Sequence, residues 1–167
     1  MGEFLELMEA HGIELVVDVR TVPRSRHVPQ FNRDSLEKVL PMHGVAYRHL
    51  ALLGGLRKPR KDSPNLGWRN ESFRGFADYM QEDHFWDGIA ELEALACDQR
   101  VAIMCAEAVP WRCHRSLIAD TLLIHGIVVR HIFSKTKVET HAMTPFAVVQ
   151  EGRILYPPGG PQSAGNF

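Results

Sequence analysis

Two cysteines, a histidine and an arginine gather in one short stretch of the sequence. An apolar run stops at Cys105, and a loop then leads to the expected start of a helix, where three candidates follow one another: Cys113, His114 and Arg115. A helix amino terminus and nearby cations lower the pKa of a thiol, which is what a cysteine nucleophile needs. We therefore predict catalytic roles for Cys105, Cys113 and His114, and for Glu107 in the loop between them.

Glu107 and His114 are candidates for proton transfer. Partial burial just beyond a strand would raise the pKa of Glu107 into a useful range, and His114 would orient it or donate to an anion. A structural alternative is open for each group: Cys105 as a small core residue, His114 as a cap. The sequence has no paired CxxC motif and no evident fourth ligand, so its spacing predicts no metal site.

A second cluster follows an earlier apolar run and is rich in arginine. Asp18, Arg20, Arg24 and Arg26 lie close together there. Guanidinium groups donate paired hydrogen bonds to phosphate or carboxylate, so the cluster predicts an anion pocket. The alternative is that one or two of these arginines pair with Asp18 or Glu107. The full predicted ligand-binding set is Asp18, Arg20, Arg24, Arg26, Gly54, Gly55 and Arg115.

Both clusters depend on how the chain alternates between strands and helices. Apolar patterning predicts strands over 13–19, 45–50, 101–105 and 127–133, and helices over 4–8, 34–40, 73–80, 85–95 and 113–125. Such alternation is typical of an α/β fold. We predict a single-domain three-layer sandwich with a mainly parallel sheet of about four to five strands. The polar residues at the strand carboxyl ends would then converge on one edge.

The chain divides into a main domain and a short extension. Residues 1–140 are predicted to form the α/β domain, and residues 141–167 a carboxyl-terminal extension that is partly loose. A short strand or hairpin is expected between 147 and 155.

The charge of the chain is nearly balanced but unevenly distributed. The 167 residues carry a net charge of −1, which excludes a strong overall attraction to nucleic acid or to an anionic membrane. Residues 20–74 nevertheless hold twelve Lys or Arg against four acidic residues, an excess of eight. This local patch favours a small anionic ligand. It also leaves open a nucleic-acid-binding module that uses the basic loop 57–74 with Trp68 as a stacking surface.

The cysteine count and the hydropathy point to the cytoplasm. Three cysteines, an odd number, favour a reducing compartment over a disulfide scaffold. No apolar run approaches the roughly 20 residues needed to span a bilayer, and the amino terminus is acidic, unlike a signal peptide. The sequence leaves the cofactor unknown and a homo-oligomer open.

The chain resembles the DUF488 family, a group of uncharacterised bacterial and archaeal proteins. The motifs that carry the resemblance, over about residues 3 to 133, are Val17-Asp18-Val19-Arg20, Pro23-Arg24-Ser25, Pro29-Gln30-Phe31-Asn32, Leu53-Gly54-Gly55, Ser72-Phe73-Arg74-Gly75-Phe76, Cys105-Ala106-Glu107 and Cys113-His114-Arg115-Ser116. The resemblance implies a single α/β domain with no agreed activity. Family members typically begin with a further strand that carries a Thr-Ile-Gly-His-Ser-like sequence. This chain starts at the following helix, so the resemblance implies an unfilled position in the sheet.

Three functions remain in competition, and whether the protein is an enzyme stays open. The first is binding, or processing, of a phosphorylated or nucleotide-like anion at the strand carboxyl ends. The second is the nucleic-acid module. The third is cysteine-based sulfur transfer or redox chemistry, which a looser likeness to rhodanese-type domains also suggests: both have a strand that ends in a cysteine ahead of a helix.

Overall fold

The computed structural model describes residues 1–159. Its helices are α1 (Gly2–Ala10), α2 (Arg33–Met42), α3 (Glu71–Tyr79), α4 (Asp83–Asp98) and α5 (Arg115–Ile124). Its strands are β1 (Leu15–Asp18), β2 (Ala46–His49), β3 (Val101–Met104), β4 (Arg130–Ile132), β5 (Val138–Thr140), β6 (Val148–Gln150) and β7 (Arg153–Leu155). Three short 3-10 turns cover Pro29–Phe31, Ala51–Leu53 and Pro110–Arg112.

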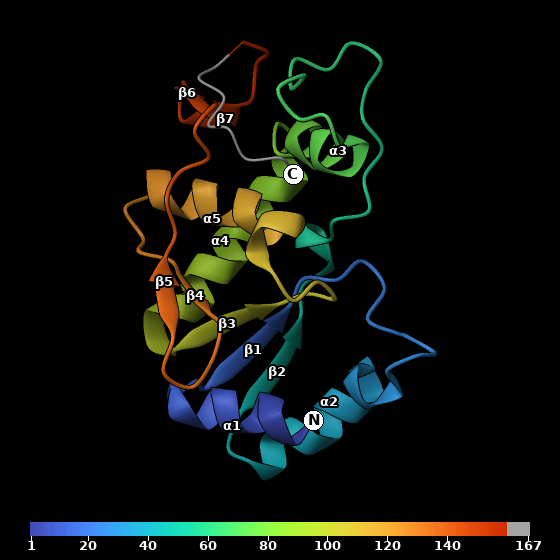
Figure 1. Ribbon diagram of the computed structural model, residues 1–167, viewed down its shortest axis with the longest axis vertical. Helices are drawn as coiled ribbons and strands as arrows, with labels where there is room; N and C mark the ends of the chain where they lie inside the picture. The colour runs from blue at the N-terminus through green and yellow to red at the C-terminus, as the bar shows by residue number, and fades with distance from the viewer. Residues whose placement is uncertain (160–167) are drawn as a thin grey trace.

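A three-stranded parallel sheet lies at the centre of the molecule, in the order β2-β1-β3 (Figure 1). Leu15 of β1 stands opposite Ala46 of β2 on one side and Val101 of β3 on the other. Every residue of β1 is buried, as expected for a central strand covered on both faces. The carboxyl ends of the three strands therefore meet at one edge of the sheet.

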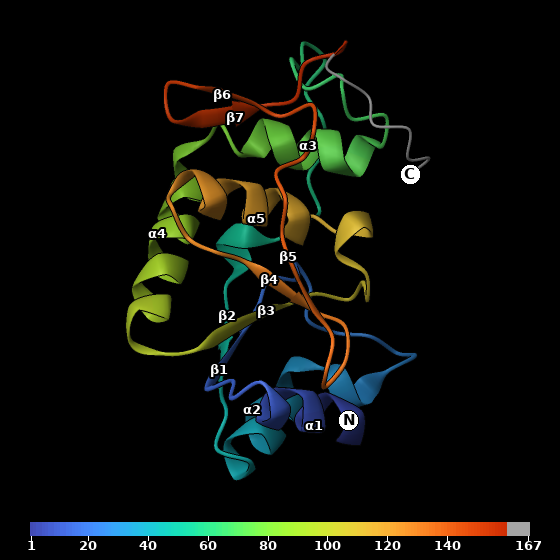
Figure 2. The same cartoon turned by 60° about the vertical axis from the view of Figure 1, so that its left-hand side comes forward.

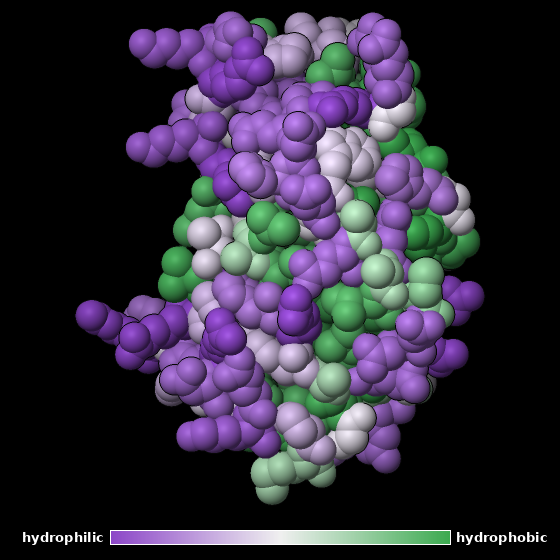
Figure 3. Space-filling model, turned by 180° about the vertical axis from the view of Figure 1, so that it is seen from behind, coloured by the Kyte–Doolittle hydropathy of each residue, from purple (hydrophilic) through white to green (hydrophobic). Residues whose placement is uncertain are grey.

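Helices cover both faces of this sheet, so the predicted three-layer α/β architecture is confirmed. Figure 2 shows α1 and α2 on one side and α3, α4 and α5 on the other. Because side chains alternate along a strand, Val16 packs with Met8 and Leu36 of the first layer, while Leu15 and Val17 join the core of the other. The surface is mainly polar at both ends of the molecule, with apolar residues showing between them (Figure 3).

The predicted strand count was wrong. Among the described residues the parallel sheet has three strands, because the segment predicted as a fourth parallel strand, 127–133, pairs elsewhere. Its β4 forms an antiparallel hairpin with β5, with Ile132 opposite Val138. The turn from Ser134 to Lys137 reverses the chain at once, and adjacent strands joined by a tight turn pair with each other before they reach a distant edge.

The hairpin expected between 147 and 155 is confirmed as β6 and β7. Gly152 at its turn has a positive φ of 75°, which glycine adopts at little cost. The chain from 141 to 159 packs into the main core, because Ile154 and Tyr156 are almost fully buried there. The rest of the predicted loose tail, 160–167, lies outside the described residues. None of the helices between residues 1 and 159 is long and apolar enough to cross a membrane.

Candidate functional site

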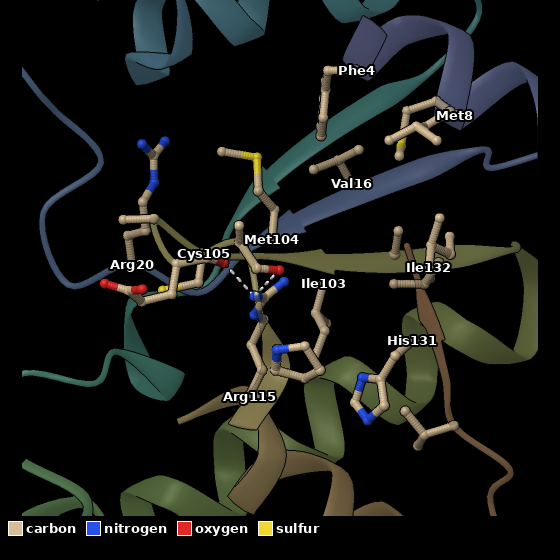
Figure 4. Close-up of a pocket in the computed structure, with 18 of the residues that line it drawn as sticks. Phe4, Met8, Val16, Arg20, Ile103, Met104, Cys105, Arg115, His131 and Ile132 are labelled. Carbon is tan, nitrogen blue, oxygen red and sulfur yellow. Dashed lines mark hydrogen bonds between the residues drawn. The ribbon is translucent and has the colours of Figure 1, made fainter. Parts of the chain in front are cut away.

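A groove of about 790 Å³ runs along the outer edge of β3. Figure 4 shows Phe4, Met8 and Val16 on one side of this strand and Arg115 and His131 on the other. Within residues 1–159, β3 has a strand neighbour only on the β1 side. Among these residues the groove therefore lies along a sheet edge that no other strand covers.

The open edge leaves main-chain groups of β3 unpaired by the sheet. The carbonyls of Arg100 and Met104 accept bonds from β1 and the residue after it, so the groups of Ala102 between them also face β1. Since successive residues of a strand point their N–H and C=O groups to opposite sides, those of Val101 and Ile103 face the groove.

His114, the residue that caps α5, sits at the carboxyl edge of the sheet with a fixed ring orientation. Its Nε2 lies 3.1 Å from the carbonyl oxygen of Val19 and 3.0 Å from that of Leu53. Two acceptors require a proton on Nε2, so the neutral ring keeps a lone pair on Nδ1. That atom lies 3.9 Å from Cys105 Sγ and 3.7 Å from Cys113 Sγ.

The absence of a side chain at Gly55 leaves room for the His114 ring. A Cβ atom at residue 55 would lie 2.4 Å from His114 Nδ1, well inside contact distance. At residue 54 a Cβ would lie 2.6 Å from the Thr21 hydroxyl. The structure thus places the two predicted ligand-binding glycines against protein groups, and neither lines the groove.

Arg115 completes the thiol cluster. Its Nε donates a hydrogen bond to Cys113 Sγ at 3.2 Å, and its Nη2 donates to the main-chain oxygen of Glu107. Cys113 is 3% exposed, whereas Cys105 is partly exposed and lines the groove. A hydrogen bond from Cys105 and the charge of Arg115 lower the pKa of Cys113 to about 6, against the cost of burial. Donating that bond, together with burial, raises the pKa of Cys105 to about 12.

The bond and the charge of Arg115 thus favour the thiolate form of Cys113, whereas burial favours the protonated form of Cys105 on the groove side. The structure brings together three of the predicted catalytic residues and one predicted ligand-binding residue: Cys105, Cys113, His114 and Arg115.

Asp18 and Arg20 neutralise each other. Arg20 donates to both carboxylate oxygens of Asp18, at 2.8 and 2.5 Å, and to the Phe31 carbonyl. Asp18 is fully buried and also accepts a 2.7 Å bond from the Tyr47 hydroxyl. Burial and the bond to Asp18 raise the pKa of Tyr47 well above its usual value. The sequence left open whether Arg20 binds a ligand or pairs with Asp18, and the structure shows the pair with Asp18.

The remaining predicted residues lie around this centre without joining it. Arg24 is exposed and lines the groove, while Arg26 is exposed outside it. The side chain of Glu107 is exposed, so the partial burial expected for its proton-transfer role is absent. His114 binds the carbonyls of Val19 and Leu53 rather than Glu107.

Three groups in the described part of the chain could also hold a metal ion. The ligand atoms of Cys105, Cys113 and His114 lie within 4.8 Å of one another. The spacing in the sequence predicted no metal site, because it contains no paired CxxC motif. Two thiolates and an imidazole are ligands for a soft or borderline cation such as zinc.

Trp68, an aromatic residue of the basic loop 57–74, packs against other rings. Trp68 stacks on Phe73 at 4.8 Å between ring centroids and also packs against Phe146 and Tyr156. Trp68 is thus half-buried and packs against the core, and its role as a stacking surface for nucleic acid stays a prediction.

Sequence reasoning missed a polar cluster on the other side of the groove. Asp120, His131 and His141 are linked by hydrogen bonds that reach from the core to the groove wall. One signal was present in the sequence: Asp120 is a lone acidic residue in the apolar helix Leu117–Ile124. A charged residue at such a position requires a buried partner.

Fold and site together define a three-layer α/β protein with a paired-thiol centre at the carboxyl edge of its sheet. The chain belongs to the family described as "Domain of unknown function DUF488", which it matches over residues 1–122. No curated protein and no solved structure matches the chain.

Proposed function

We propose that the protein carries out reversible thiol–disulfide chemistry with Cys105 and Cys113 on a substrate that enters the groove. The hydrogen bond from Arg115 Nε to Cys113 Sγ, at 3.2 Å, carries this proposal. A sulfur that accepts a bond from a guanidinium group is favoured as the thiolate, the nucleophilic form. Its partner, Cys105, lies within 4.8 Å and lines the groove, where a substrate can reach it.

The exchange proceeds in two balanced steps. Cys113 first takes the proton of Cys105, and the resulting Cys105 thiolate attacks one sulfur of a substrate disulfide. The substrate S–S bond breaks, and the first substrate sulfur leaves with the proton now on Cys113, which becomes a thiolate again. The thiolate of Cys113 then attacks Cys105 Sγ, forms the Cys105–Cys113 disulfide and releases the second substrate sulfur as a thiolate. The protein is oxidised by two electrons and the substrate is reduced by two.

The charges around the groove favour an anionic substrate. Arg24 and Arg115 both line it, and Arg24 is exposed. Arg20 contributes little net charge because Asp18 neutralises it. The small anionic ligand expected from the sequence thus becomes, in this proposal, a small disulfide that carries carboxylate groups.

The test is equilibration with oxidised and reduced glutathione in a Cys97→Ser background, which removes the exposed third cysteine. We expect the protein to lose two alkylatable thiols together as the buffer becomes more oxidising, as read by mass spectrometry. Cys113→Ser should trap glutathione on Cys105, and Cys105→Ser should trap it far more slowly. Two thiols that stay free in the most oxidising buffer, or equal trapping by both variants, would overturn the proposal.

A further inference from the structure

A carboxylate lies in the core of the protein, under the groove. Asp120 of α5 is fully buried. It accepts hydrogen bonds from the main-chain N–H of Thr144 at 3.0 Å, from the Tyr156 hydroxyl at 2.8 Å and from His141 Nε2 at 2.8 Å. Three donors satisfy the ionised form of a carboxyl group and favour it over the protonated form. Asp120 is thus a buried anion.

The Asp120 carboxylate determines which nitrogen carries the proton, first in the ring of His141 and then in the ring of His131. Because the carboxylate only accepts, Nε2 of His141 carries a proton, and the neutral ring has a lone pair on Nδ1. His131 Nε2 lies 2.9 Å from that atom and supplies the proton of the bond between them. The remaining nitrogen of His131, Nδ1, is then an acceptor. The side chain of His141 is 7% exposed, so water competes little for these bonds.

The chain of bonds ends in the groove. His131 lies on β4, is partly exposed and lines the groove near Arg115 (Figure 4). Between residues 1 and 159 its Nδ1 has no hydrogen-bond partner. The charged and titratable groups that act on His131 are His141, Arg115 and Glu139. Burial is the largest cause that lowers its pKa; the charges of His141 and Arg115 lower it further, and Glu139 opposes them.

We propose that Asp120 and His141 are positioning residues that hold His131 as a proton acceptor, with Nδ1 offered to the groove. The ligand it fits is one that presents an acidic O–H, N–H or S–H group. When His131 takes up that proton at Nδ1, its Nε2 proton moves to His141 Nδ1, and the resulting imidazolium lies against the Asp120 carboxylate. After the uptake the positive charge lies on His141, beside Asp120, and His131 on the groove wall is neutral.

This proposal is independent of the thiol chemistry, and either can fail alone. Its test is the long-range proton–nitrogen spectrum of the imidazole rings in the ¹⁵N-labelled protein, with His131 assigned by its loss in His131→Gln. At a pH well above the usual histidine pKa of about 6.5, where no proton has been taken up, we expect one tautomer of His131, with the proton on Nε2. A proton on Nδ1, or a mixture of both tautomers, would overturn the proposal without any variant.

A variant of His141 tests whether the hydrogen bond from His131 to His141, rather than packing alone, sets the tautomer of His131. His141→Leu should release His131 into a mixture of tautomers, whereas the matched control His125→Leu, which removes a histidine paired with Glu93 near the end of α5, should leave the His131 signals unchanged. An unchanged His131 tautomer in a folded His141→Leu variant would refute the positioning role. Diethyl pyrocarbonate, which modifies neutral imidazole nitrogen, should label His131 in the native protein, and a protected His131 would contradict an open groove nitrogen.

Discussion

Replacing Arg115 by glutamine tests whether its guanidinium group holds Cys113 as a thiolate. The Nε–Sγ distance is 3.2 Å. At that distance two unit charges attract by about 1.3 kcal/mol even with the full screening of water, and by about 5 kcal/mol at the effective dielectric of a protein surface. The smaller figure corresponds to about one pKa unit. Arg115→Gln should therefore raise the pKa of Cys113 from about 6 by at least roughly one unit.

The measurement is the rate of alkylation of Cys113 against pH, in the Cys97→Ser background and with peptide-level mass spectrometry. A lowered pKa means that the reactive thiolate is present above about pH 6 and is lost as the pH falls through that value. The midpoint should move upward in Arg115→Gln. It should stay in place in Arg112→Gln, which removes a nearby exposed arginine. Equal midpoints in both variants and the parent would refute the role of Arg115.

Three further predictions concern stability and exchange. Gly55→Ala places a Cβ 2.4 Å from the site imidazole and should lower the free energy of unfolding by about 1–3 kcal/mol in urea titrations; an unchanged midpoint would show that the ring moves freely. Tyr47→Phe removes a 2.7 Å bond to the buried Asp18 carboxylate and should cost about 1.5–3 kcal/mol by the same method, so a neutral result would contradict the closed ion-pair cluster. In hydrogen exchange, the groove-facing amide of Ile103 should exchange faster than the paired amide of Ala102, and equal protection would mean that the β3 edge is covered.

The sequence determined the local elements because apolar periodicity records which side of a segment is buried. Residues 13–19, 45–50 and 101–105 were predicted as strands, and the structure has strands inside each of these ranges. The helix predicted over 113–125 is present as α5, and Gly126 follows it with a positive φ of 78°. The gathering of Cys105 and His114 at the strand carboxyl edge also followed from this alternation, since parallel strands end on the same side.

Pairing between distant groups was decided only by the tertiary structure. Periodicity shows that the segment 127–133 is extended, but it does not show that β4 pairs with β5 rather than with the sheet. Nor does it show that Arg20 turns back onto Asp18 instead of toward a ligand.

The positions of the protons in the site were also decided by the tertiary structure. The direction of His114 Nδ1 toward two sulfurs depends on two carbonyl oxygens that lie 95 and 61 positions away in the chain. The link from Asp120 through His141 to His131 joins α5, the segment that follows β5, and β4. A sequence records which residue types are present, whereas the partner of each buried donor and acceptor is set by the packing of the folded chain.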